Sequence, residues 1–429
     1  MQDLIDLKLS EYRNAESFEN FLFGRGGGGR PAKPRSTSTE TFIFGAGKFG
    51  RNLVCAFKHA GLALTGIVDN DTSKHGETYD GIPVFPPEKL RDNLVGSHVV
   101  ISLVANVDAA EKQLKELGLP ASNIHFGRKS RSDKGKRLYY YLSNCAIGVL
   151  AWHDVTNLDY TVRRDIDLIS NVYHSLADEK SKDVLISRIA LSLSGETFGA
   201  LSLFLEEHSS SVCENKLKFG LSFYSPMPLP EFGYYFNQDF LHLNDGEVYV
   251  DVGAEDGNTI IPFYEEMFKN SYVPGKVVAF EPDPDTFRIL SNNVSGITNV
   301  TLENKGIGAQ NSILNFRKTQ DFGTHRVCGS FDPEGDIPIP VTTIDEYFKG
   351  KKISLIKFDP SGEAIIAGLH GASKTILSQR PKIIAGSYHK IENLYKIPEL
   401  LLTLAPSYDI YLRHLAYHAN ETHAFAIPR

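Results

Sequence analysis

The sequence predicts an α/β protein with two Rossmann-like, doubly wound sheets, a smaller one near the N-terminus and a larger one in the C-terminal half. Two observations indicate this. A glycine-rich turn follows a short apolar strand at residues 42–50 and again at 248–257, and after each turn a second strand ends in an acid. Between them, apolar residues repeat at three- and four-residue steps, as in helices. The expected organisation is an N-terminal segment with a flexible linker (1–40), a Rossmann-like nucleotide-binding domain (41–130), a helical segment (138–233) and a catalytic α/β domain (234–429).

Composition excludes several classes of protein. The 429 residues allow two or three domains, and the formal net charge of −7 argues against a general nucleic-acid binder, which usually carries a basic face. The four cysteines are far apart in the sequence and form no CxxC pair, which favours a reducing compartment over a disulfide framework or a zinc knuckle. No apolar run approaches the ~20 residues that span a bilayer, and the first residues lack a signal-peptide pattern. We therefore expect a cytoplasmic protein without a membrane span.

The first glycine-rich turn, FIFGAGKFG at 42–50, has the GxGxxG spacing between a predicted strand and a predicted helix. A second strand at 64–68 ends in an acid 24 residues after the first glycine. In such a turn the backbone can approach a phosphate at the helix N-terminus, and the acid can accept a ribose hydroxyl. The alternative is that the glycines only pack the helix against the strand. The predicted N-terminal nucleotide site is Gly45, Gly47, Gly50 and Asp69.

Residues 68–90 resemble the N-terminal domain of bacterial sugar acyltransferases, which binds a nucleotide-sugar. The similarity lies in VDND at 68–71, GIPV at 81–84 and PEKL at 87–90. It implies a nucleotide-sugar as a second ligand, whereas the GxGxxG spacing also fits a dinucleotide. The covered length, roughly residues 41–126, is short for an independent dehydrogenase, although a nicotinamide-dependent bifunctional enzyme remains an alternative.

Two polar stretches interrupt these domains. Residues 25–39 are rich in glycine, proline and basic side chains and are interpreted as a flexible linker. Residues 127–137 carry six basic side chains, and we interpret them as a solvated loop at a domain boundary. The alternative for this loop is a patch that binds phosphates of an activated glycan.

The second glycine-rich turn predicts a nucleoside pocket. Val248 to Val252 form a buried strand, Gly253 and Gly257 allow a tight turn, and the strand at 276–280 ends in Glu281. A carboxylate at this edge of a parallel sheet can accept two ribose hydroxyls. Because no Walker lysine is present to hold a triphosphate, S-adenosylmethionine (SAM) fits the pocket best.

From about residue 234 onward the chain resembles the FkbM family of SAM-dependent methyltransferases, most of which are linked to O-methylation of sugars and polyketide-like products. The resemblance implies a class I methyltransferase fold, with a doubly wound sheet that ends in an antiparallel strand pair near 410–414 and 424–427. It also implies SAM contacts at Asp251, Gly253, Asp256 and Gly257, with the ribose held by Glu281. The matching stretches are 235–236, 250–257, 279–283, 304–308, 341–346, 356–359, 369–372, 387–390 and 411–414.

One stretch departs from the family pattern. The family usually shows Asp-x-Glu-Gly followed by Ala-Glu, whereas this chain has DPSGEA at 359–364. Ser361 stands where the first glutamate is expected, and Glu363 falls one position before the second. This departure keeps open the alternative of a non-catalytic or impaired SAM- or nucleotide-binding module.

Asp359 and His389 are the predicted catalytic residues, because the strand predicted at 355–359 ends in Asp359 and the strand predicted at 382–388 ends at His389. His389 has the better intrinsic pKa for accepting a proton from a hydroxyl. No metal site is predicted, since His414 and His418 would have metal-like spacing only on a helix and the local pattern favours a strand. The expected function is SAM-dependent O-methylation of a sugar, glycan or similar hydroxylated metabolite. The expected partner is a small-molecule or glycan acceptor and not a nucleic acid; a homo-oligomer is left open.

Overall fold

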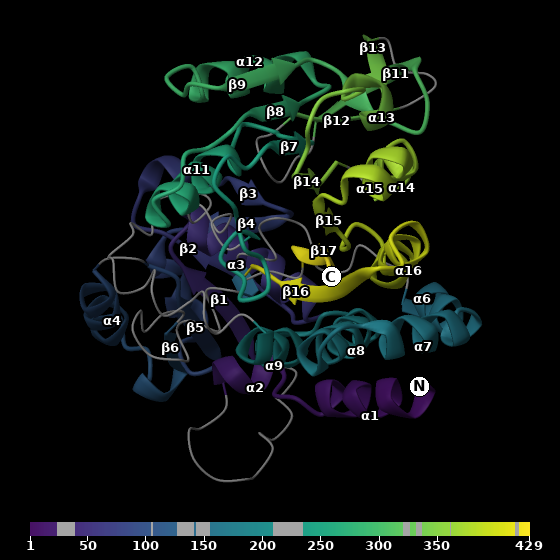
Figure 1. Cartoon of the computed structure of the whole chain (residues 1–429). Helices are drawn as coiled ribbons and strands as arrows, with labels where there is room; N and C mark the ends of the chain where they lie inside the picture. Colours follow the sequence, from purple (N-terminus) through teal and green to yellow (C-terminus); the bar gives the residue numbers. More distant parts are fainter. Residues whose placement is uncertain are drawn as a thin grey trace. The chain divides into compact units, whose positions relative to one another are not determined.

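The structure is a computed structural model that describes residues 1–23, 39–103, 106–126, 141–142, 155–208, 235–320, 327–331, 337–360, 362–416 and 420–429. The linker predicted at 25–39, apart from Thr39, lies outside these residues, as do the basic stretch at 127–137 and His418. Contacts divide the chain into two compact units (Figure 1). One comprises Met1–Lys8, Thr156–Ala190 and Glu206–Arg429, and the other Leu9–Val155 and Leu191–Leu205.

The N-terminal unit contains a six-stranded sheet in the order β3-β4-β2-β1-β5-β6, which is parallel except for the β3–β4 hairpin. Phe42, Phe44 and Val99 lie in its core. The strands are β1 (Glu40–Phe44), β2 (Gly66–Val68), β3 (Thr78–Tyr79), β4 (Ile82–Phe85), β5 (Ser97–Ile101) and β6 (Ile124–Phe126), with α3 (Lys48–His59), α4 (Val107–Glu116) and short 3₁₀ helices at Thr72–Lys74, Pro87–Asn93 and Ala121–Asn123.

Helices dominate the described residues outside the sheets. The N-terminal segment forms α1 (Gln2–Arg13) and α2 (Phe18–Phe23), and the predicted helical segment contains α6 (Val155–Arg164), α7 (Ile166–Ser175), α8 (Glu179–Leu193) and α9 (Phe198–His208). Asp178, just before α8, accepts hydrogen bonds from the Ser181 backbone N–H at 2.8 Å and from Arg413 Nη2 at 2.6 Å. These bonds cap the start of α8 and fix it to the last strands of the C-terminal sheet.

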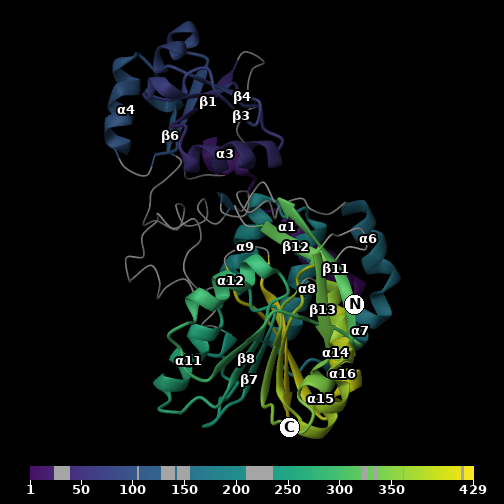
Figure 2. The same ribbon diagram turned by 90° about the horizontal axis from the view of Figure 1, so that it is seen from above.

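The C-terminal sheet has seven strands in the order β16-β17-β15-β14-β7-β8-β9. All its pairs are parallel except β15–β17 and β16–β17. Figure 2 shows α11 and α12 on one side of the strands and α14, α15 and α16 on the other. The strands are β7 (Tyr249–Val252), β8 (Val277–Phe280), β9 (Val300–Glu303), β14 (Leu355–Phe358), β15 (Lys382–Gly386), β16 (Tyr408–His414) and β17 (Thr422–Pro428), and the helices α11 (Ile260–Lys269), α12 (Pro284–Asn293), α13 (Ile344–Tyr347), α14 (Gly362–His370), α15 (Ser373–Gln379) and α16 (Asn393–Leu404).

A small four-stranded sheet interrupts this unit between β9 and β14. Its order is β10-β13-β11-β12, with β10 (Gly306–Ile307), β11 (Ser312–Gln320), β12 (Val327–Phe331) and β13 (Ile337–Thr342). The chain therefore builds β7, β8 and β9 in one direction and then returns to add β14 on the other side of β7. In an open α/β sheet, ligands bind outside the carboxyl ends of the strands at such a change of direction, which here lies between β7 and β14.

The structure confirms the predicted α/β fold class and the antiparallel pair at the end of the chain. One boundary differs: the strand predicted at 382–388 ends at Gly386, so His389 follows the strand instead of ending it. Ser387 still contacts β17, because its backbone N–H donates to the Thr422 carbonyl oxygen at 2.8 Å. None of the helices in the described residues is both long enough and apolar enough to span a membrane.

Candidate active site at the carboxyl edge of the C-terminal sheet

The turn after β7 depends on glycine at two positions. Gly253 has a φ of +78°, and a Cβ there would lie 2.8 Å from the Pro360 backbone nitrogen and 2.9 Å from the Asp359 carbonyl group. Glycine therefore allows the turn after β7 to lie directly against the turn after β14. Gly257 has a φ of +89°, and a Cβ there would lie 3.0 Å from side-chain atoms of α12 and of Val294, which follows that helix.

Glu281 follows β8 and faces the same turn. Its Oε2 accepts a hydrogen bond from the Glu255 backbone N–H at 3.0 Å, and its Oε1 accepts one from the Asp283 N–H at 2.9 Å. The side chain is 7% exposed, and burial raises the pKa of its carboxyl group to about 8, with a further contribution from the Asp283 and Asp251 carboxylates. Burial raises the pKa of Glu281 by more than the two backbone N–H donors, which favour the ionised form, lower it.

Asp251 is fully buried in β7 and has partners within the protein. Its Oδ1 accepts a hydrogen bond from Lys357 Nζ in β14 at 3.1 Å, and its other oxygen accepts one from the Thr259 hydroxyl. Burial alone would lower the pKa of Lys357, but the Asp251 and Asp359 carboxylates raise it. The pair joins the two central strands directly below the turn. Asp256 lies in the turn itself, where its carbonyl oxygen accepts a hydrogen bond from Asn293 Nδ2 at 2.8 Å.

Asp359, the first residue after β14, is the centre of a cluster of polar side chains. Its Oδ1 accepts a hydrogen bond from the Tyr388 hydroxyl at 3.0 Å, and His389 Nε2 lies 3.8 Å from the same oxygen. Lys357 Nζ lies 3.8 Å from Oδ2. Burial alone would raise the pKa of Asp359, but Lys357 and the nearby imidazoles hold it well below its usual range. The two predicted catalytic residues are thus brought together at the sheet edge.

The cluster also contains two residues near the end of the chain that sequence reasoning missed, Glu421 just before β17 and His423 within it. His423 is fully buried, and its Nε2 lies 3.5 Å from Asp359 Oδ2 and 3.1 Å from the Tyr235 hydroxyl oxygen. The Tyr235 hydroxyl donates to Glu421 Oε2 at 2.9 Å. The register explains their position, because His423 pairs with Gly386 at the end of β15. Only the placement of β17 between β15 and β16 brings them here.

Glu363 is not part of the cluster, although it is the acid closest in sequence to the position where the family pattern has its second glutamate. Its side chain is 85% exposed and forms an ion pair with Lys390 at 2.6 Å. Glu421 instead provides the second carboxylate beside Asp359.

Comparisons with known proteins show what this part of the chain is similar to. Residues 251–418 match the family described as Methyltransferase FkbM domain. The C-terminal part of the chain therefore contains a methyltransferase domain. No curated protein matched the chain.

The crystal structure of methyltransferase FkbM from Methylobacillus flagellatus KT is similar over 98% of this chain and 99% of its own, with a TM-score of 0.55 and 18% sequence identity. At this identity the likeness shows a shared fold. A putative rRNA-methylase from Clostridium thermocellum covers 46% of this chain and 94% of its own, with 14% identity and a TM-score of 0.31. A fibrillarin from Aeropyrum pernix, in complex with natively bound SAM, covers 46% of this chain and 73% of its own, with 11% identity and a TM-score of 0.29.

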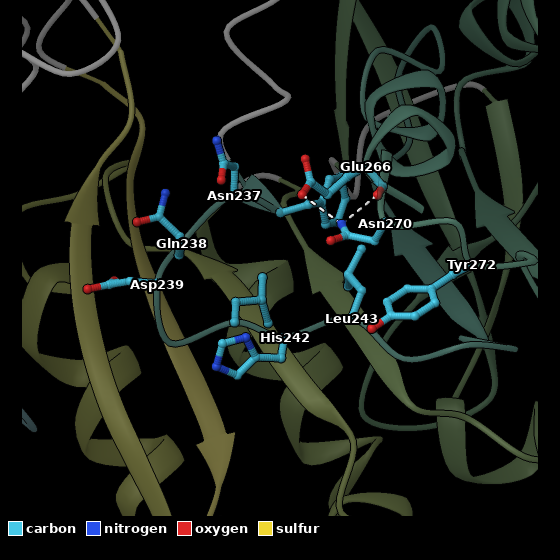
Figure 3. A pocket seen from close by; sticks show the side chains of 10 residues that line it. Asn237, Gln238, Asp239, His242, Leu243, Glu266, Asn270 and Tyr272 are labelled. Atoms are coloured by element: carbon cyan, nitrogen blue, oxygen red, sulfur yellow. Dashed lines mark hydrogen bonds between the residues drawn. The ribbon is translucent and has the colours of Figure 1, made fainter. Parts of the chain in front are cut away.

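A separate pocket of about 410 Å³ lies between residues 236–243 and the C-terminal end of α11 in the methyltransferase domain. Figure 3 shows Glu266 and Asn270 hydrogen-bonded on one wall, with Asn237, Gln238 and Asp239 along the facing segment. None of the predicted site residues lines it.

The N-terminal glycine loop forms as predicted, but its acid is bonded to the loop. Asp69 Oδ2 accepts the Ala46 backbone N–H at 2.6 Å and lies 3.4 Å from Lys74 Nζ. A Cβ at Gly50 would lie 2.0 Å from the Gly45 carbonyl oxygen, whereas one at Gly47 would meet no atom within 4 Å. Gly50 is therefore needed for packing of α3 against the loop, and Gly47 is the position that leaves space above the turn.

Proposed function

We propose that this methyltransferase transfers the methyl group of SAM to a hydroxyl group of a sugar, a glycan or a similar hydroxylated metabolite. The observation that carries the donor assignment is the buried Glu281 carboxyl group after β8, held against the glycine turn that follows β7. This is the position at which an acid in a parallel sheet accepts ribose hydroxyls. The match of residues 251–418 to the FkbM domain supports the same assignment.

In the proposed donor site, Glu281 binds the ribose, and the turn containing Gly253, Asp256 and Gly257 approaches the nucleoside and the methionine part. Asp251 acts through Lys357: their buried ion pair fixes the Lys357 ammonium 3.8 Å from Asp359. Asp251 is therefore a positioning residue and not a direct ligand, because its carboxylate is fully buried with partners inside the protein.

The proposed transfer takes place beside Asp359. The acceptor oxygen attacks the methyl carbon in line with the sulfur, the C–S bond breaks to leave S-adenosylhomocysteine, and the hydroxyl proton passes to His389. Asp359, whose pKa is held well below its usual range, instead orients the acceptor hydroxyl or the methionine amine. The Tyr388 hydroxyl donates to the Asp359 carboxylate and His389 lies beside it, so the surroundings of Asp359 are polar and suit a polyhydroxylated acceptor. This polar surrounding, together with the formal net charge of −7, supports a sugar over a nucleic acid.

For the N-terminal unit, we propose that Gly45, Gly47, Gly50 and Asp69 form a site for a nucleotide, either the nucleotide part of an activated sugar or a dinucleotide. The space above Gly47 supports this, because a phosphate could approach the backbone at the start of α3. Stabilisation of the protein by NAD but not by nucleotide-sugars would favour the nicotinamide-dependent alternative.

The test of the proposed function uses SAM with a radioactive methyl group and a panel of nucleotide-sugars, free sugars and glycans. We expect label in the acceptor with the wild type, and a loss of at least about 100-fold in Asp359→Asn. His389→Gln should lose more in kcat than in KM if His389 accepts the proton. Binding of S-adenosylhomocysteine without transfer to any member of the panel would instead favour the non-catalytic module.

A further inference from the structure

Four polar atoms, one of them from Asp359 itself, converge at the carboxyl edge of the C-terminal sheet. They are Asp359 Oδ2, Glu421 Oε2, His423 Nε2 and the Tyr235 hydroxyl oxygen. The hydroxyl lies 2.9 Å from Glu421, 3.1 Å from His423 and 3.4 Å from Asp359. His423 Nε2 lies 3.5 Å from the Asp359 oxygen and 3.8 Å from the Glu421 oxygen. Each of the two carboxylates has an oxygen within 4.8 Å of the other and of the imidazole.

These separations fit the coordination sphere of a metal ion. Ligand atoms at about 2.1 Å from a four-coordinate ion lie about 3.4 Å from one another. The five individual separations given above range from 2.9 to 3.8 Å and so surround a centre of this size. The atoms come from three separate parts of the chain, so no local turn explains their convergence.

The charges of the cluster also favour a cation. The carboxylates of Asp251 and Asp359 lie 3.1 and 3.8 Å from the Lys357 ammonium, and Glu421 adds a third carboxylate beside Asp359. One fixed positive charge thus faces three acids in a largely buried site, and buried charges are normally paired or bound to metal. The fully buried His423, whose Nε2 faces the acids, is a common metal ligand.

We propose that Asp359, Glu421 and His423 bind a divalent first-row transition-metal ion, with the Tyr235 hydroxyl as a fourth neighbour. Two carboxylates and one imidazole suit ions such as Zn²⁺ or Mn²⁺ better than Mg²⁺ or Ca²⁺, which prefer oxygen ligands alone. This replaces the sequence-based expectation of no metal. That expectation considered only His414 and His418, and His414 lies on strand β16 with its Nδ1 3.0 Å from the Thr422 hydroxyl.

The use of the ion in catalysis, unlike its binding, rests on the proposed function. A divalent ion at this position would polarise an acceptor hydroxyl and lower its pKa, so that the proton leaves more readily as the new C–O bond forms. Glu421 would then supply the second acidic ligand that Ser361 and the exposed Glu363 do not provide.

Binding of Co²⁺ to the full-length protein tests the site without an activity assay. Four-coordinate Co²⁺ gives a visible d–d absorption band, which we expect to saturate at one ion per chain for the wild type. Glu421→Gln and His423→Gln should each weaken binding at least about tenfold. The matched control, Glu363→Gln, removes an exposed acid outside the cluster and should bind as the wild type does.

Circular dichroism of each variant distinguishes loss of a metal ligand from loss of the fold. If His423→Gln does not fold, Glu421→Gln alone tests the metal site. No band in the wild type, or equal Co²⁺ affinity in Glu421→Gln, would overturn the proposal and identify the cluster as a network of hydrogen bonds alone. Stabilisation by S-adenosylhomocysteine, measured in the same samples, reports separately on the donor site. Loss of that signal with Co²⁺ binding retained would count against the proposed function and leave the metal site standing.

Discussion

The two glycine-rich turns of this chain have the same order of strand, turn, helix and acid in the sequence, and they differ in the charges around the acid. Each turn follows a central strand, and each has an acid after the neighbouring strand that accepts a backbone N–H of the turn. Asp69 accepts from Ala46 at 2.6 Å, and Glu281 accepts from Glu255 at 3.0 Å. A sequence pattern of this kind therefore predicts the loop and its acid equally well in both units.

The difference is the charge around the acid. Asp69 has the Lys74 ammonium 3.4 Å away, whereas both hydrogen bonds given above for Glu281 come from backbone N–H groups, and Asp251 and Asp283 add negative charge nearby. Burial therefore keeps the Glu281 carboxyl protonated up to about pH 8. A ligand that donates hydroxyl hydrogen bonds would favour its ionised form. The comparison supports Glu281 as the ribose acceptor of the proposed donor site, whereas Asp69, which binds its own turn in the same way, has a lysine beside it.

The largest expected effect is the loss of stability when the side chain that anchors each glycine-rich turn is removed. Asp251→Ala removes one partner of a buried ion pair and leaves the Lys357 ammonium uncompensated, so we expect it to destabilise the protein by about 3–5 kcal/mol in urea unfolding. In the N-terminal turn the comparable support is the Ser102 hydroxyl, which donates to the Phe44 and Gly45 carbonyl oxygens at 3.0 Å. Ser102→Ala should cost about 1–3 kcal/mol. Equal costs would contradict the claim that the C-terminal turn has the stronger electrostatic anchor.

A second effect separates the glycines that the fold requires from those that leave space. Gly50→Ala places a Cβ 2.0 Å from a backbone oxygen, and Gly253→Ala adds strain at φ +78° to a contact of 2.8 Å. Each should destabilise by more than about 2 kcal/mol. Gly47→Ala meets no atom within 4 Å and should change stability by less than about 1 kcal/mol. Thermal unfolding of the three variants measures this, and a large loss in Gly47→Ala would show that this position is packed after all.

The raised pKa of Glu281 predicts a pH dependence of stability. The folded state keeps this proton up to about pH 8, whereas the unfolded chain releases it near 4.5, the ordinary pKa of a glutamate, so the folded state binds more protons in between. The free energy of unfolding of the wild type should therefore fall as pH rises from about 5 to 8. Glu281→Gln should remove this fall and gain roughly 1–3 kcal/mol over the wild type at pH 8. A pH-independent difference between the two proteins would contradict the assignment.

The smallest effect is expected at Asp69. Asp69→Asn keeps an acceptor for the Ala46 N–H but loses the attraction of the partly exposed Lys74, so we expect a loss of no more than about 1 kcal/mol in thermal unfolding. A loss of several kcal/mol would mean that Asp69, like Asp251, holds a buried charge network.

The sequence predicted the strands, glycine-rich turns and helices around each turn well, because each of these elements depends on residues that are close together in the sequence. The strand before Glu281 and the strand pair near 410–414 and 424–427 are confirmed. The roles of the predicted site residues stay predictions. Glu421 and His423 could not be found in this way, because they reach Asp359 only through the antiparallel placement of β17 beside β15. The protein partners of Asp251 also required the structure, since Lys357 lies 106 residues away in the sequence.

The most direct test of the account is thermal stabilisation by S-adenosylhomocysteine, compared for the wild type, Glu281→Gln and the matched variant Asp69→Asn. A ligand at 100 times its Kd adds about 2.7 kcal/mol of stability. We predict a clear rise in Tm for the wild type and for Asp69→Asn, and no rise for Glu281→Gln at the same ligand concentration. A rise that survives in Glu281→Gln and is lost in Asp69→Asn would contradict the account, because it would locate the ligand at the N-terminal turn.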